Sequence, residues 1–320
     1  MITQLNASAL RLFRQLAEHA NRYRVAVSSS GNVLDFGVNV AGGLQAGLHL
    51  TEICMGDLVT ATIVPVDFST SAAPPATQLI HVTTDQPAVA CMASQYGGWP
   101  VSTDDFFAIG SGPFRVARGK EPVLEKYGWK DTPNQVVGVL ESANLPDDSV
   151  IEMIAQQCQV KTQDVFLCVA PTRSLAGTIQ IVGRSVEATM HKLFELGVDI
   201  TRVVSASGTA PLPPLASDDL TAIGHTNDAI LYGGQVTLWV DMSDQEIAEL
   251  GPQTPSNFSD EFGKPFIELF EACGNDFYKL DPMLFSAAIV RFVSTQTGAQ
   301  FQFGETKHSL LHQQWTVQSG

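Results

Sequence analysis

The segment Gly183-Arg184-Ser185-Val186-Glu187 places a guanidinium and a carboxylate three residues apart. The apolar spacing around it predicts one long helix over residues 175–196, in which side chains three apart share a face. On a solvated surface this would be an ordinary ion pair with little effect on stability. Facing a ligand, Glu187 could instead act as a general base that Arg184 orients. Spacing alone leaves both interpretations open, and the surface ion pair is the commoner.

Other motifs for metal or phosphate chemistry are weak. His308 and His312 have the i,i+4 spacing of a zinc-binding helix, but the glutamate of the zinc-protease motif is missing, so we interpret them as surface histidines. The five cysteines form no CxxC pair, which favours buried thiols over disulfides or a thiolate metal site. Gly110-Ser111-Gly112-Pro113 is too short for a phosphate-binding loop, although its glycines could let a ligand approach the backbone. We therefore expect no bound metal.

The charge balance argues against two kinds of partner. The chain has 18 basic and 33 acidic residues, a net charge of −15, and no basic cluster of the kind that binds nucleic acid. No stretch approaches the roughly 20 apolar residues needed to cross a bilayer. Residues 1–23 lack the apolar core of a signal peptide. The expectation is a soluble, cytoplasmic protein with neither nucleic-acid nor membrane partners.

The succession of predicted elements favours an α+β fold. At 320 residues, about two domains are expected. Helices and strands are mixed without a steady βαβ rhythm, which argues against one doubly wound sheet. A polar stretch at residues 118–135, rich in Gly, Pro and charges, is the best candidate for a boundary. We predict a first subdomain at residues 1–125 and a second at 126–320, whose C-terminal strands could return to the first.

Two segments have more than one interpretation. Apolar alternation predicts a strand over residues 230–240, so that Asn227 and Asp228 would form a turn ahead of it. Residues 94–99, Ser-Gln-Tyr-Gly-Gly-Trp, end a helix predicted over residues 88–96. They could simply stop that helix with a packed Trp, or they could supply polar and aromatic groups to a binding site.

Four segments together resemble one family. Their order and spacing are similar to those of the methenyltetrahydromethanopterin cyclohydrolases, and the segments are Ala90–Trp99, Gly110–Pro113, Gly183–Glu187 and Thr226–Gly234. Asp35–Asn39 and Gly42-Gly43-Leu44 are similar as well. The resemblance extends from about residue 25 to residue 310, and several long motifs in one order are far more specific than any one of them.

The resemblance implies a cytoplasmic hydrolase of one-carbon metabolism, commonly a homotrimer without a permanently bound cofactor, that serves methanogenesis or formaldehyde oxidation. It implies two α/β-type subdomains packed around a central cleft that holds the pterin. The reaction would be reversible hydrolysis of 5,10-methenyltetrahydromethanopterin to the 5-formyl compound, with Glu187 as general base and Arg184 positioning it. The expected substrate-binding residues are Ser94, Gln95, Tyr96, Trp99, Ser111, Gly112, Asn227 and Asp228.

Departures from the family pattern keep other functions open. His225 stands where many relatives carry Arg, Gly97 where Ala is common, and Phe114 where a small residue is usual. These changes concern contacts to the pterin tail more than the chemistry. The alternatives are a non-catalytic pterin-binding protein, a cyclic-amidine hydrolase acting on a tetrahydrofolate derivative, and a structural, oligomer-forming protein.

Overall fold

The computed structural model describes residues 4–66 and 73–315 of the chain. It divides into two compact units. Unit 1 comprises Met1–Thr60 and Val89–Gln180, and unit 2 comprises Ala61–Ala88 and Ile181–Gly320. The chain therefore passes between the units three times, whereas the sequence prediction places a single boundary near residue 125. Each unit holds one mixed, six-stranded sheet with helices packed on it, which confirms the α+β class.

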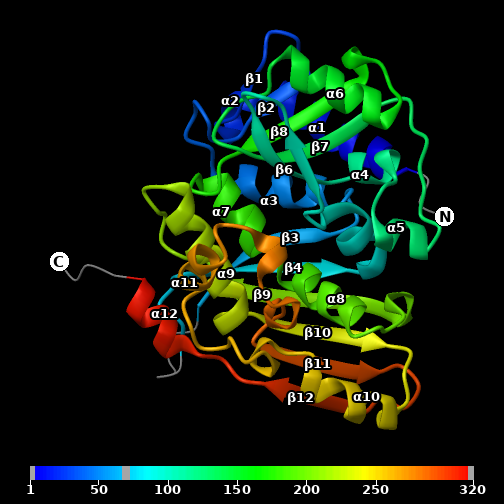
Figure 1. Cartoon of the computed structure of the whole chain (residues 1–320), viewed down its shortest axis with the longest axis vertical. Coiled ribbons are helices and arrows are strands. Elements are labelled where there is room, and N and C mark those ends of the chain that lie inside the picture. The colour runs from blue at the N-terminus through cyan, green and yellow to red at the C-terminus, as the bar shows by residue number, and fades with distance from the viewer. Residues whose placement is uncertain (1–3, 67–72, 316–320) are drawn as a thin grey trace. The chain divides into compact units, whose positions relative to one another are not determined.

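Unit 1 is built on a sheet with the strand order β1-β2-β8-β7-β6-β5 (Figure 1). Its strands are β1 (Ala26–Val27), β2 (Val33–Asp35), β5 (Trp99–Ser102), β6 (Phe107–Ser111), β7 (Val136–Glu141) and β8 (Val165–Ala170). Its helices are α1 (Leu5–Glu18), α2 (Ala20–Tyr23), α3 (Leu44–Cys54), α4 (Phe114–Arg118), α5 (Pro122–Lys126), α6 (Asp148–Cys158) and the short 3₁₀ turn η2 (Thr162–Asp164). A π-helix, η1 (Ala88–Gln95), leads into β5.

The central strands of this sheet are apolar on both sides because helices cover both faces. On β7, Val137 and Val139 pack in a cluster with α1 and α3, whereas Val136 and Leu140 pack in a second cluster with α6. The strands β2, β8 and β7 run parallel to one another. Near-continuous apolar strands are typical of parallel sheets buried on both faces.

Unit 2 is built on a second sheet with the order β12-β11-β10-β9-β4-β3. Its strands are β3 (Thr60–Pro65), β4 (Gln78–Thr84), β9 (Val203–Pro211), β10 (Gln235–Val240), β11 (Ile289–Ser294) and β12 (Gln300–Gly304). The α-helices are α8 (Ser185–Glu195), α9 (Asp219–Gly233), α10 (Asp244–Leu250), α11 (Phe266–Ala272) and α12 (His308–Gln314). Five 3₁₀ turns complete it: η3 (Ile200–Arg202), η4 (Gly251–Gln253), η5 (Ser256–Phe258), η6 (Phe277–Lys279) and η7 (Pro282–Leu284).

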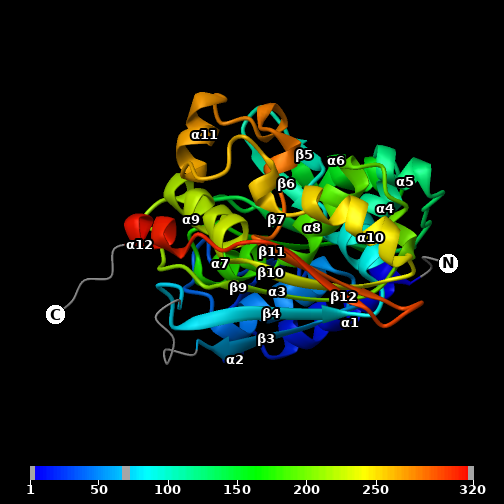
Figure 2. The same cartoon turned by 90° about the horizontal axis from the view of Figure 1, so that it is seen from below.

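Helices cover one face of the second sheet. Figure 2 shows α8, α9 and α10 on the same side of β9, β10 and β11. Along β10, Val236, Leu238 and Val240 are buried, while Trp239 between them is exposed. This alternation is expected of a mainly antiparallel sheet with one packed face. None of the helices in residues 4–66 and 73–315 has the length and apolar character that a membrane span requires.

The predicted strand over residues 230–240 is wrong in its first half. Residues 219–233 form α9, with Asp218 as N-cap accepting a hydrogen bond from the backbone N–H of Thr221, and β10 begins only at Gln235. Asn227 and Asp228 therefore lie in a helix, not in a turn. The apolar run Ile230-Leu231-Tyr232 suits a buried strand and a buried helix equally well, so periodicity could not decide between them.

The predicted helix over residues 175–196 is two helices. α7 (Leu175–Val182) ends before Gly183-Arg184, and α8 begins at Ser185 with Arg184 as its N-cap. The Arg184 carbonyl accepts the first intrahelical hydrogen bond of α8, from Ala188 N at 2.8 Å. Glu187 consequently lies in the first turn of a helix, where the helix dipole favours a negative charge.

Gly208 on β9 lets the start of α8 lie directly on the sheet. A Cβ at this glycine would come within 2.6 Å of Ser185 Oγ and 2.7 Å of Val186 Cγ2. Distances this short do not occur in real structures, so a larger residue would displace α8 or β9. The backbone that carries Glu187 is thus fixed by close packing.

Candidate functional site

Arg184 and Glu187 form a loose, mostly buried pair. Arg184 Nη1 and Glu187 Oε2 are 3.9 Å apart, and the two side chains are only 13% and 10% exposed. The separation exceeds hydrogen-bond distance, so the carboxylate keeps its Coulomb attraction to the guanidinium without a direct bond. A solvated surface pair would be far more exposed. The low exposure therefore argues against an ordinary surface ion pair.

The opposite side of α8 is tied to the segment ahead of β11. Thr189 Oγ1 accepts a hydrogen bond from Ala287 N at 3.3 Å and donates one to Ser185 O at 3.1 Å. Lys192 is buried, donates from Nζ to Met283 O, and lies 5.1 Å from the centre of the Phe258 ring. Burial lowers the pKa of Lys192 to about 8, although nearby Asp281 acts in the other direction. These contacts fix the rotation of α8 and hence the direction of Glu187.

A buried polar cluster in unit 1 brings three predicted binding residues together. Gly112 N donates to Ser94 O at 2.7 Å, and Ser94 Oγ donates to Cys54 O at 2.7 Å. Cys54 Sγ is in hydrogen-bond contact with Ser111 Oγ at 3.2 Å and accepts from Gln180 Nε2 at 3.3 Å. Gly112 has a φ of 104°, which glycine adopts without strain. Hydrogen bonds thus join the loop after β6 to the end of η1.

The segment that joins η1 to β5 is buried at both ends and half-buried in its middle. Ser94 and Gln95 have no exposed surface, and Trp99 is 1% exposed. The Trp99 ring packs on Phe114, with ring centres 4.6 Å apart, and the Arg118 guanidinium lies 4.5 Å from it. Trp99 thus supports the segment from the core. Only Tyr96, Gly97 and Gly98 are half-buried, and they are the part of the segment that a ligand can reach.

The two remaining predicted residues make hydrogen bonds that serve the fold of unit 2. Asn227 Nδ2 donates to Ile223 O at 2.9 Å, within its own helix. Asp228 Oδ1 accepts from Phe266 N at 2.8 Å, at the start of α11. Tyr232, one turn further along α9, donates to Lys264 O and accepts from Gly263 N. Asp228 and Tyr232 therefore hold the segment that leads into α11.

The buried carboxyl group of Asp228 predicts a pH-dependent stability. Burial raises its pKa from 3.8 to about 7, against the hydrogen bond from Phe266 N. Between pH 4 and 7 the folded protein holds a proton that the unfolded chain has released, so this group makes stability fall as the pH rises. The ionised carboxylate lowers the free energy of unfolding by its full amount above pH 7 and not at all below pH 4.

We expect Asp228→Asn to remove this pH dependence, since the amide oxygen can still accept from Phe266 N–H. Urea unfolding at pH 5 and at pH 8 should show the variant gaining stability over wild type at the higher pH. Glu249→Gln, an exposed change of the same charge on α10, is the control and should leave the difference unaltered. Parallel pH profiles for wild type and Asp228→Asn would contradict the assignment.

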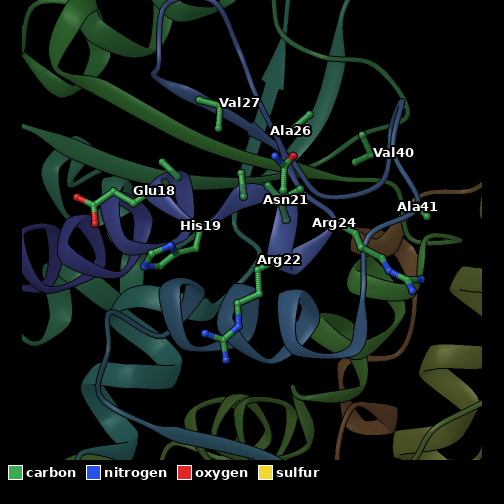
Figure 3. Close-up of a pocket in the computed structure, with 12 residues that line it drawn as sticks. Glu18, His19, Asn21, Arg22, Arg24, Ala26, Val27, Val40 and Ala41 are labelled. Carbon is green, nitrogen blue, oxygen red and sulfur yellow. The ribbon is translucent and has the colours of Figure 1, made fainter.

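Unit 1 also carries a surface hollow that none of the predicted residues lines. It is bounded by the end of α1, by α2, by β1 and by Val40 and Ala41. Figure 3 shows the guanidinium groups of Arg22 and Arg24 pointing away from each other across it. Because these cations do not converge on one point, the hollow has no obvious anion site. In residues 4–66 and 73–315, no three or more His, Cys, Asp or Glu side chains gather as a metal site would require.

Several supporting residues were not identified from the sequence. Cys54 and Gln180 join the cluster around Ser111, and Arg115 and Glu121 lie beneath Tyr96. In the cluster and in the Tyr96 segment, the hydrogen-bond partners of Cys54 and Arg115 are 21 or more residues away in the sequence, so no local spacing marks them. Arg115 follows Gly110–Pro113 closely, and that proximity to a predicted motif was the one available signal.

Comparison with known proteins agrees with these motifs. The family model described as "Cyclohydrolase (MCH)" matches residues 4–315. A protein of Rhodopirellula baltica is 45% identical over 87% of this chain and 84% of its own length. One of Methylobacillus flagellatus is 40% identical, covering 94% of this chain and 92% of its own, and one of Methanococcoides burtonii is 38% identical, covering 92% and 91%. All three are named methenyltetrahydromethanopterin cyclohydrolase.

The structure defines an α+β protein of two mixed-sheet units, with a buried Arg–Glu pair at the start of one helix. The family follows from the length and identity of these matches. The chain belongs to the methenyltetrahydromethanopterin cyclohydrolases.

Proposed function

We propose that this protein reversibly hydrolyses the methenyl group of a tetrahydromethanopterin-type cofactor to the 5-formyl derivative. Family membership over residues 4–315 supports the reaction class. The observation that supports its catalytic centre is the mostly buried Arg184–Glu187 pair in the first turn of α8. We further assign the enzyme to the cytoplasm, to a homotrimer, and to one-carbon metabolism in formaldehyde oxidation or methanogenesis.

The chemistry needs a base and a positioning group. The methenyl carbon bridges two nitrogens in a delocalised cation and is therefore electrophilic. Glu187 takes a proton as water attacks this carbon, which gives a neutral carbinolamine. Collapse of the carbinolamine breaks the bond to N10, whose electron pair takes the proton back from Glu187. The hydroxyl proton leaves to solvent, and the formyl group remains on N5.

The pair contributes in two further ways. The Glu187 carboxylate attracts the cationic substrate and stabilises the positive charge until water has added. Arg184 holds the carboxylate and the water in line, which is an orientation effect. Arg184 can orient Glu187 across the 3.9 Å between them, and it takes no proton itself because a guanidinium is already protonated.

Substrate contacts are assigned to two groups of residues. In unit 1 they are the half-buried Tyr96 and the backbone of Gly97 and Gly98, supported from below by Ser94, Gln95, Trp99, Ser111 and Gly112. In unit 2 they are Asn227 and Asp228, of which Asp228 acts indirectly, by accepting the hydrogen bond from Phe266 N at the start of α11. Aromatic and backbone groups of this kind suit the flat, polar ring of a pterin.

The test is turnover by the purified protein, followed as loss of methenyl absorbance, with methenyltetrahydromethanopterin and methenyltetrahydrofolate assayed in parallel. We expect hydrolysis of the first and little of the second. Binding without turnover would instead identify a pterin-binding protein. Preference for the folate derivative would overturn the assigned cofactor but not the reaction.

A further inference from the structure

Arg115 on α4 forms a buried ion pair with Glu121. Its side chain has no exposed surface, and Glu121 is 7% exposed. Arg115 Nε donates to Glu121 Oε1 at 2.9 Å, and Nη2 contacts Oε2 of the same carboxylate. Two parallel N–H···O contacts hold a guanidinium in a defined plane. Glu121 is the N-cap residue of α5, and its side chain makes no capping hydrogen bond.

The same guanidinium reaches the end of η1. Arg115 Nη1 donates to Ser94 O at 2.9 Å and to Ala93 O at 3.4 Å. The last carbonyls of a helix have no partner within the helix, and Arg115 supplies a buried donor to both of these groups. Ser94 O also accepts from Gly112 N. Arg115 therefore joins α4, η1 and the loop after β6.

Arg115 and Glu121 also form the floor beneath the half-buried segment Tyr96–Gly98. The Arg115 guanidinium carbon lies 5.1 Å from the centre of the Tyr96 ring, a cation–π distance. A Cβ on Gly98 would stand 3.0 Å from the Glu121 carboxylate and 3.0 Å from the Tyr96 ring edge. The backbone of Gly98 thus rests on the carboxylate, and the Tyr96 ring rests on the guanidinium.

A buried ion pair is a poor means of stabilising a fold, because removing both charges from water costs about as much as their attraction returns. Its distinctive effect is to fix geometry. Here the guanidinium bonds Ala93 O and Ser94 O and lies against the Tyr96 ring, all in the segment that carries Tyr96. We propose that Arg115 and Glu121 are positioning residues, which set the Tyr96–Gly98 segment for binding the pterin. The proposal rests on the proposed function.

The test replaces both charges together. The double variant Arg115→Met, Glu121→Leu leaves no unpaired buried charge and should fold. The new side chains fill about the same volume, but the hydrogen bond to Ser94 O and the guanidinium against the Tyr96 ring are lost. We expect KM for the methenyl cofactor to rise about tenfold or more while kcat changes about threefold or less, because binding is lost and not the chemistry. The single variant Arg115→Lys should also have a raised KM, since an ammonium lacks the planar, forked donors of a guanidinium.

The control is Ile154→Ala, a core truncation on α6 of the same unit. It should lower stability but leave KM unchanged, which separates positioning from general loosening. Unchanged KM in a folded double variant would overturn the proposal. Absence of turnover in the wild type would instead refute the proposed function.

Hydrogen exchange then tests the positioning without the substrate. The amides of Tyr96, Gly97 and Gly98 should exchange faster in the double variant than in wild type or Ile154→Ala. Exchange as slow as in wild type would show that the pair does not hold the segment.

Discussion

Glu187→Gln is expected to lower kcat by about 10²–10⁴-fold, the usual range for loss of a general base. Glutamine keeps the size of the side chain and its place in the first turn of α8, but its amide cannot take a proton from water. Folding should be preserved, because glutamine is nearly isosteric with glutamate and its amide can still form hydrogen bonds. Turnover is measured as the loss of methenyl absorbance, and stability by urea unfolding of the same preparations.

Glu195→Gln is the matched control for this experiment. Glu195 lies at the other end of α8, its side chain is 36% exposed, and it faces His191. The change alters charge by the same amount on the same helix, and kcat should stay near that of wild type. If Glu187→Gln were as active as this control, another group would have to be the base.

Arg184→Ala is expected to lower kcat by about 10²-fold, because a misplaced carboxylate and water lose their alignment. The helix should persist, since the capping carbonyl of Arg184 belongs to the backbone and remains. Substrate affinity should change less than kcat, as removal of an interaction made in the transition state predicts. Lysine at this position should restore little, because it lacks the planar guanidinium.

Arg202→Ala provides the comparison for the loss of a surface arginine in the same unit. Arg202 pairs with Glu246 at 2.8 Å in a partly exposed ion pair. Arg202 also donates from Nε to Asp241 O at 2.8 Å, so stability should fall somewhat, whereas kcat should stay near that of wild type because this pair has no part in the proposed chemistry. Near-wild-type turnover by Arg184→Ala would show that its pair with Glu187 is equally dispensable.

Much of the fold could be predicted where one physical signal dominated. The apolar patterns of the sequence also predict a helix over residues 44–54 and strands over residues 136–140 and 165–169, and α3, β7 and β8 agree closely with these ranges. The first half of the predicted strand over residues 230–240 is wrong, because the short apolar run of three residues, Ile230-Leu231-Tyr232, fits either structure. The side-chain cap at Asp218 was the better signal for α9.

The candidate site could be predicted only where its residues are neighbours in sequence. Arg184 and Glu187 stand three apart, and the structure keeps them close although the helix around them is broken. The surroundings of Tyr96 are different. Ser94 is 40 residues from Cys54 and 21 from Arg115, and only the fold brings these residues into contact. No pattern in the chain marks such long-range partners.

The bare backbone of Gly208 under α8 has a mechanical consequence. The side chains of Ser185 and Val186 pack straight onto this glycine, so a displacement of β9 is passed to the first turn of α8 and to the Glu187 carboxylate that it carries. If Glu187 is the base proposed above, substitutions along β9 should therefore alter the catalytic rate more than the substrate affinity.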